Sequence, residues 1–248
     1  MIQKVELTQP WKGKIEPFKI AGNLYFVGMH AASSHLIDTG DGLILMDTGY
    51  LTGLYLVLES IRKLGFDPMD IKYIINSHWH WDHAEASGAM ADLTGAKNLI
   101  GHHDEEDVKR YCNPDILVHE GDTLSLGNTT IHFMETPGHT KGTLSFFFDV
   151  EEGGKTYRVG TFGGAGHNTL VPGDQEYEGC VEDYRNSLAR LRQEHVDIFM
   201  GNHMWNNNTE GKADVLRTTG ENKFIDPAEW TKFLDQCEEG WNRVCNPM

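Results

Sequence analysis

Short apolar runs bounded by turn residues occur through most of the chain, and each run predicts a β-strand. The glycine-rich turn at 40–42 joins two of these runs as a hairpin. The predicted strands lie at 18–20, 24–27, 34–38, 43–47, 73–75, 96–100, 116–118, 123–126, 130–134, 143–148, 156–159 and 196–200.

Apolar residues at helical spacing predict helices between these strands. The clearest cover residues 53–64 and 84–91, and a short one opens at 104–106. Another carries Val181, Tyr184, Leu188 and Leu191 on one face, and the last begins with Asp226 as N-cap and Pro227 in its first position. The order of elements predicts an α+β protein: two mixed sheets face to face, with helices outside. We expect one domain over residues 1–248, without a linker or repeat.

The segment 76–83, Asn-Ser-His-Trp-His-Trp-Asp-His, stands between a predicted buried strand and a predicted helix. His78 and His80 are two residues apart, so in an extended segment both point the same way and can share one metal ion. Asp82 and His83 follow as the chain turns into the helix, where they can reach a second ion. Imidazole and carboxylate ligands suit zinc. A surface loop that happens to be rich in histidine is the weaker alternative.

Two further histidines follow predicted strands. His139 stands in the turn Thr-Pro-Gly-His-Thr at 136–140, and His203 follows the predicted strand at 196–200. A lone histidine is more often structural, but both become candidate ligands beside the 78–83 segment.

Composition limits the partners of the protein. The 248 residues carry a formal net charge of −16, which opposes binding to nucleic acids or anionic membranes, and no apolar run is long enough for a membrane span. The amino terminus has no signal-peptide pattern, so we expect a cytoplasmic protein unless a signal was removed. The four cysteines are predicted to be free thiols, with a disulfide between Cys237 and Cys245 as the alternative.

The chain resembles the metallo-β-lactamase superfamily in four motifs. They are L-M-D-T-G at 45–49, H-W-H-W-D-H at 78–83, T-P-G-H-T at 136–140 and G-N-H at 201–203. The segment at 17–28 resembles the subclass B3 β-lactamases in particular. The resemblance implies an αββα sandwich with a site for two Zn²⁺ at one edge of the sheets. By motif, His78, His80 and His139 would bind the first zinc, and Asp82, His83 and His203 the second. Asp47 would form hydrogen bonds beneath the metal loop.

The loop after the strand at 156–159 distinguishes branches of this family. Many of its hydrolases have an aspartate there that bridges both metals, but residues 161–167 contain no acidic residue. This agrees with the B3 pattern and weakens assignment as a glyoxalase-type thioesterase or homoserine-lactone lactonase. B3 enzymes usually place serines in the loop, where this chain has Ala165 and His167.

The resemblance implies a zinc-dependent hydrolase in which hydroxide activated by two zinc ions attacks the carbonyl of a small lactam, ester, lactone or amide. Asp82 would also orient the nucleophile. We expect His167, Trp205 and Tyr111 at the rim of the substrate pocket. Two alternatives remain, a nuclease or phosphodiesterase of the same superfamily and a metal-binding protein without catalysis. His30, His102 and His103 could also face the site, with a solvated loop position as the alternative for each. The other histidines are predicted to be structural: His35, His119, His132 and His195.

Overall fold

The computed structural model describes residues 7–245 and contains two β-sheets. The larger sheet has seven strands in chain order. They are β1 (Phe18–Ala21), β2 (Leu24–Phe26), β3 (His35–Asp38), β4 (Leu43–Met46), β5 (Ile71–Ile75), β6 (Lys97–Gly101) and β7 (Ile116–Val118). Strands β1 to β4 are antiparallel, and β4 to β7 are parallel. The carboxyl ends of β5 and β6 therefore meet at one edge.

The second sheet has five strands in the order β12-β11-β10-β9-β8. They are β8 (Thr123–Leu126), β9 (Thr129–Glu135), β10 (Leu144–Glu152), β11 (Lys155–Thr161) and β12 (Ile198–Phe199). All pairs are antiparallel except β11 with β12.

The two sheets pack face to face around one hydrophobic core. Phe26, Ile44 and Ile75 from the larger sheet meet Phe146 and Phe148 from the smaller one, and all five are buried. Alternation along each strand sends the next side chains to the outer faces, where helices cover them.

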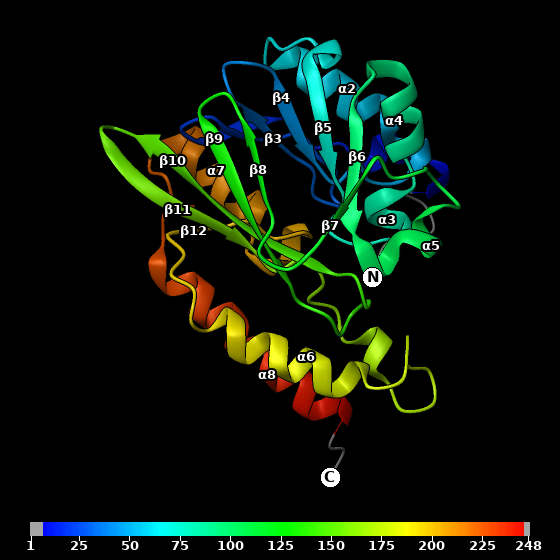
Figure 1. Ribbon diagram of the computed structural model, residues 1–248. Coiled ribbons are helices and arrows are strands. Elements are labelled where there is room, and N and C mark those ends of the chain that lie inside the picture. Colours follow the sequence, from blue (N-terminus) through cyan, green and yellow to red (C-terminus); the bar gives the residue numbers. More distant parts are fainter. Residues whose placement is uncertain (1–6, 246–248) are drawn as a thin grey trace.

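Each outer face has its own helices (Figure 1). Helices α2 (Leu54–Lys63) and α4 (Ser87–Thr94) pack on the larger sheet, and α6 (Cys180–Leu191) and α8 (Pro227–Cys245) pack on the smaller one. The other helices are α3 (Trp81–Ala84), α5 (Glu105–Val108) and α7 (Thr209–Thr219). Six 3₁₀ turns complete the described elements: η1 (Pro10–Gly13), η2 (Leu51–Gly53), η3 (Pro68–Asp70), η4 (His102–Asp104), η5 (Asn168–Leu170) and η6 (Met204–Asn206).

The predicted αββα sandwich is thus confirmed, with local differences. The predicted helix at 84–91 is two helices, α3 and α4, and the strand expected at 196–200 keeps ladder pairing only at Ile198–Phe199. Helix α7 was not predicted. All four cysteines are free, so the alternative disulfide between Cys237 and Cys245 is not formed. Within residues 7–245, no helix is long and apolar enough to cross a membrane.

Candidate metal centre

The six candidate ligands gather where several strands end. His78 and His80 follow β5, His139 follows β9, and His203 follows β12. A backbone hydrogen bond from Leu144 to the Ser77 carbonyl (2.8 Å) ties the end of the larger sheet to the start of β10 in the smaller one. The edge of the sandwich therefore brings together ligands far apart in sequence.

His78, His80 and His139 form the first ligand group. One ligand atom from each lies within 4.8 Å of the others. The Nδ1 of His80 is 3.0 Å from the Nε2 of His139. Three imidazole nitrogens at this spacing can surround a single divalent ion.

Asp82, His83 and His203 form the second ligand group. The Oδ2 of Asp82 is 3.7 Å from the Nε2 of His83 and 3.8 Å from the Nε2 of His203. Asp82 and His83 lie on α3, and Asp82 is in its first turn. The rings of His78 and His83 are 4.3 Å apart between centroids, so the two groups adjoin.

Asp47 supports both groups from beneath, as predicted. Its Oδ2 accepts hydrogen bonds from the Nδ1 of His83 (2.8 Å) and the hydroxyl of Ser77 (2.8 Å). Its Oδ1 accepts from the Ser77 backbone N–H (2.7 Å). Asp47 has a φ of 53°, in the left-handed region that few non-glycine residues adopt. Such partners fix the orientation of histidine ligands.

Carbonyl groups orient two more histidines. The Nδ1 of His139 lies 2.9 Å from the Gly166 carbonyl, and the Nδ1 of His203 lies 2.9 Å from the Ala31 carbonyl. Because a carbonyl can only accept, each Nδ1 carries the proton and each Nε2 keeps a free lone pair. This is the tautomer that binds metal through Nε2.

The donor set fits zinc. The Nε2 of His78 is buried and has no hydrogen-bond partner among the described residues. Burying a polar atom without a partner costs free energy, and an ion within the first ligand group would remove that cost. Five imidazoles and one carboxylate are ligands that zinc accepts.

Burial controls the charge of these histidines. It holds the pKa of His78 and His139 well below the usual range, and neighbouring histidines lower it further. Burial also lowers the pKa of His203, to about 4. For His83, burial acts the same way, but the Asp82 and Asp47 carboxylates outweigh it and raise the pKa. Three of the six candidate ligands are therefore kept neutral, the form that binds metal.

Asp104 connects the two metal loops, which are the segment 76–83 and the turn around His139. No sequence pattern predicted this role. Its Oδ2 accepts hydrogen bonds from the Trp79 backbone N–H (3.1 Å) and the Thr140 hydroxyl (2.7 Å), and its Oδ1 accepts from the Gly142 N–H (2.6 Å). Burial raises the pKa of this carboxyl to about 6 although these hydrogen bonds act in the opposite direction. Nothing local distinguishes Asp104 from the acidic residues that follow it.

Two of the three predicted pocket residues lie beside the second ligand group. His167 and Trp205 line a hollow of about 240 Å³ together with His203. The Trp205 ring, about half exposed, stacks on His203 with centroids 4.3 Å apart. The Nε2 of His167 is 2.7 Å from the Cys237 carbonyl on α8. Tyr111 instead lines a different hollow, with Gly88 and Cys112.

Glu176 is an acidic residue beside the first ligand group. Its Oε1 is 3.6 Å from the Nε2 of His80, and its side chain is 25% exposed. The backbone of Glu176 is tied to Thr169, whose hydroxyl contacts His139 at 3.1 Å. Negative charge therefore stands at the rim of the site.

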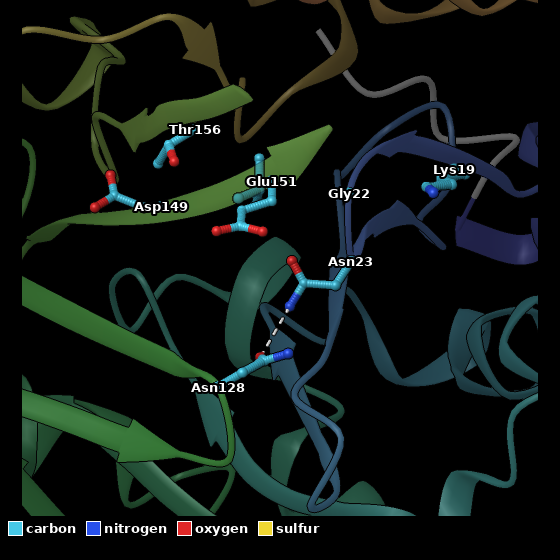
Figure 2. Close-up of a pocket in the computed structure, with 8 residues that line it drawn as sticks. Lys19, Gly22, Asn23, Asn128, Asp149, Glu151 and Thr156 are labelled. Atoms are coloured by element: carbon cyan, nitrogen blue, oxygen red, sulfur yellow. Dashed lines mark hydrogen bonds between the residues drawn. The ribbon is translucent and has the colours of Figure 1, made fainter. Parts of the chain in front are cut away.

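Another hollow lies away from these candidate ligands. It has a volume of about 560 Å³ and is open and polar, and Figure 2 shows Asn23, Asn128, Asp149 and Glu151 around it. Asp149 and Glu151 lie toward the far end of β10 from Leu144, which contacts the metal loop. None of the six candidate ligands lines this hollow.

Comparison with known proteins agrees with this geometry. The family model of the metallo-β-lactamase superfamily matches residues 27–203, which include all six candidate ligands. Among solved structures, a subclass B3 metallo-β-lactamase of Bradyrhizobium japonicum is 30% identical, with a TM-score of 0.87 over 95% of this chain and 96% of that one. A class B3 di-zinc metallo-β-lactamase from an Alaskan soil metagenome is 26% identical, with a TM-score of 0.84 over 96% and 97% of the two chains.

Curated relatives match over a shorter stretch. An N-acyl homoserine lactonase of a Bacillus species is 28% identical over 149 residues, which are 48% of this chain and 59% of the lactonase. A hydroxyacylglutathione hydrolase of a Chelativorans strain is 34% identical over 92 residues, which are 37% of this chain and 34% of the relative. The chain thus spans less than two thirds of either relative.

Proposed function

Because the chain belongs to the metallo-β-lactamase superfamily, we propose that it is a zinc-dependent hydrolase that opens a lactam, lactone or ester of small size. The observation that carries the proposal is the convergence of six ligand side chains in two adjoining groups, with the buried Nε2 of His78 left without a partner. Unpartnered buried nitrogens are costly in a site that holds no ion.

His78, His80 and His139 would hold one zinc ion, and Asp82, His83 and His203 a second. Bound zinc supplies Lewis acidity for a carbonyl oxygen and lowers the pKa of water. The two ligand groups adjoin at the sheet edge, where the rings of His78 and His83 lie 4.3 Å apart between centroids. Activation of the water and polarisation of the carbonyl would therefore act on the same small region.

Asp82 is the proposed catalytic residue of the chain. Its Oδ2 lies close to both His83 and His203, and 15% of the side chain remains exposed. The carboxylate can therefore accept a hydrogen bond from the attacking water and fix the direction of its lone pair. It can also take up the proton that the water releases.

The hollow beside His203 is the proposed binding site for the body of the substrate. Trp205 offers an exposed aromatic face there, and the ring of His167 is held by α8. We propose that both contact substrate. We also propose Tyr111 as a residue at the rim of the substrate pocket. Its neighbour Arg110 packs over the Trp79 ring, 4.3 Å from the ring centroid.

Charge at the rim favours neutral substrates. The Glu176 carboxylate stands 3.6 Å from His80, so the carboxylate that β-lactams carry would meet a like charge there. Neutral lactones and esters carry no such charge. N-acyl homoserine lactonases are among the relatives, but residues 161–167 lack the acidic residue that bridges both metals in many hydrolases of the family, so the proposal covers neutral lactones and esters in general.

A β-lactamase is the second candidate. The observation in its favour is that the subclass B3 structures match 95% or more of the chain, whereas the curated lactonase matches 48%. A nuclease is disfavoured by the net charge of −16.

Turnover of nitrocefin and of an acyl homoserine lactone by the zinc-loaded protein tests the proposal. We expect lactone turnover that is lost in His78→Ala, and lower kcat/KM with nitrocefin. His132→Ala is the matched control, because His132 lies on the exposed face of β9. Turnover that survives in His78→Ala, or that chelation leaves unchanged, would contradict a role for the first ligand group. Faster turnover of nitrocefin would favour the second candidate.

A further inference from the structure

A third group of ligand side chains lies outside the proposed catalytic site. It consists of His102, His119 and Glu135, and one ligand atom from each lies within 4.8 Å of the others. His102 opens turn η4 after β6, His119 follows β7, and Glu135 ends β9. We propose that this group, the peripheral site, binds a divalent transition-metal ion such as Zn²⁺.

The closest contact in the peripheral site joins a histidine to a carboxylate. The Nδ1 of His102 is 2.8 Å from the Oε1 of Glu135. Both atoms are shielded from solvent, yet neither has a hydrogen-bond partner among residues 7–245. Small rotations of the two side chains would let this nitrogen and this oxygen turn toward one ion, together with a nitrogen of His119.

The neighbouring imidazoles are stacked. The ring of His102 lies 4.2 Å from that of His119 and 3.7 Å from that of His103, between centroids. Protonated rings at such distances would repel one another. Neutral imidazole is the metal-binding form, and two imidazoles with one carboxylate suit zinc, cobalt or nickel.

The surrounding charges leave Glu135 available. Arg190 pairs with Glu120, whose other carboxylate oxygen accepts a hydrogen bond from the Glu135 backbone N–H (2.7 Å). Glu120 is thus already engaged by a cation. The carboxylate of Glu135 faces His102 instead.

An ion in the peripheral site would join the two sheets. His102 and His119 follow strands of the larger sheet, and Glu135 belongs to the smaller one. Turn η4 also contains Asp104, which braces Trp79 and Thr140 in the two metal loops. Glu135 stands just before the turn that carries His139. Bound metal would therefore stabilise the fold behind the catalytic site without belonging to it. The inference does not depend on the proposed function.

Metal stoichiometry tests this proposal on the whole chain. Apoprotein is dialysed against Zn²⁺, and bound metal is measured in the wild type, His119→Ala and Glu135→Gln. We expect each variant to bind about one ion per chain fewer than the wild type. His195→Ala is the control, because His195 is exposed and pairs only with Asp197 among the contacts that the structure records. Zinc bound at the two catalytic ligand groups is counted equally in the wild type and in the variants, so it does not affect the difference between them.

Thermal unfolding supplies a second readout. Saturating Zn²⁺ should raise the Tm of the wild type more than that of Glu135→Gln, which keeps the size of the side chain and removes its charge. Equal stoichiometry in the wild type and both variants would overturn the peripheral site. Equal loss of metal in His195→Ala would also overturn it, because the binding would then belong to surface histidines in general.

Discussion

The Asp47 carboxylate accepts a hydrogen bond from the Nδ1 of His83 at 2.8 Å, and both side chains are buried. Asp47 is not itself a proposed metal ligand. Because its carboxylate engages the Nδ1 of His83, the Nε2 is left available to bind metal. The same carboxylate holds the Ser77 hydroxyl, which lies 3.1 Å from the Nδ1 of His78. Asp47 therefore orients one histidine in each ligand group.

Asp47→Asn should weaken zinc binding. The amide keeps the shape of the side chain but loses the charge and replaces one acceptor with a donor, so it cannot serve both His83 and Ser77. We expect about a 10- to 100-fold loss of zinc affinity, measured by competition with a chromophoric chelator. Asp41→Asn, in the exposed turn at 40–42, is the control and should bind zinc like the wild type. Unchanged affinity in Asp47→Asn would remove its positioning role.

Local sequence patterns predicted the elements whose ends carry the ligands. The Gly-Asp-Gly turn at 40–42 fixed the hairpin of β3 and β4, because Gly40 and Gly42 both adopt positive φ. Helix α8 begins at Pro227 as expected from its first-position preference. The family motifs pointed to the six ligands, which the structure brings together as the two expected groups.

What the sequence did not predict depends on tertiary contacts. Helix α7 has a polar sequence and few buried residues, so its periodicity is weak. Asp104, at the end of turn η4, and Glu176, in the loop between η5 and α6, approach the candidate ligands through the fold, and no local pattern marks them. His119 was expected to be structural, and His102 was a loop residue that could also face the catalytic site. The structure places both with Glu135, because three separate strand ends meet there.

Glu176→Gln should shift substrate preference. The change removes a negative charge near His80, so anionic β-lactams should gain kcat/KM relative to a neutral lactone by about 5-fold, or ~1 kcal/mol for partly exposed charges. Parallel assays with nitrocefin and the lactone measure the ratio, with zinc content determined alongside. The control Glu178→Gln changes an exposed residue of the same loop. A ratio that does not move would show that Glu176 has no part in selectivity.

Trp205→Ala should raise KM more than it lowers kcat. The exposed indole stacks on His203 and lines the hollow beside it. Loss of an aromatic contact with substrate costs about 0.5–1.5 kcal/mol, which is roughly a 2- to 13-fold rise in KM. Tyr55→Ala removes an aromatic ring of similar exposure from α2 and should leave KM unchanged. A fall in kcat alone would instead indicate that Trp205 acts by holding His203.

Acid should destabilise the fold through His35. This residue is buried on β3, and burial lowers its pKa to about 4 from an ordinary value of 6.5. Between those values the unfolded chain binds a proton that the folded chain does not, so stability is complete above pH 6.5 and falls as pH drops toward 4. The full shift corresponds to about 3 kcal/mol.

Urea unfolding of apoprotein at pH 7 and pH 5 measures this effect. The free energy of unfolding should fall less between these pH values in His35→Gln than in the wild type. His195→Ala, which changes an exposed histidine, should lose as much stability as the wild type. Equal losses in all three proteins would show that other groups control the acid response.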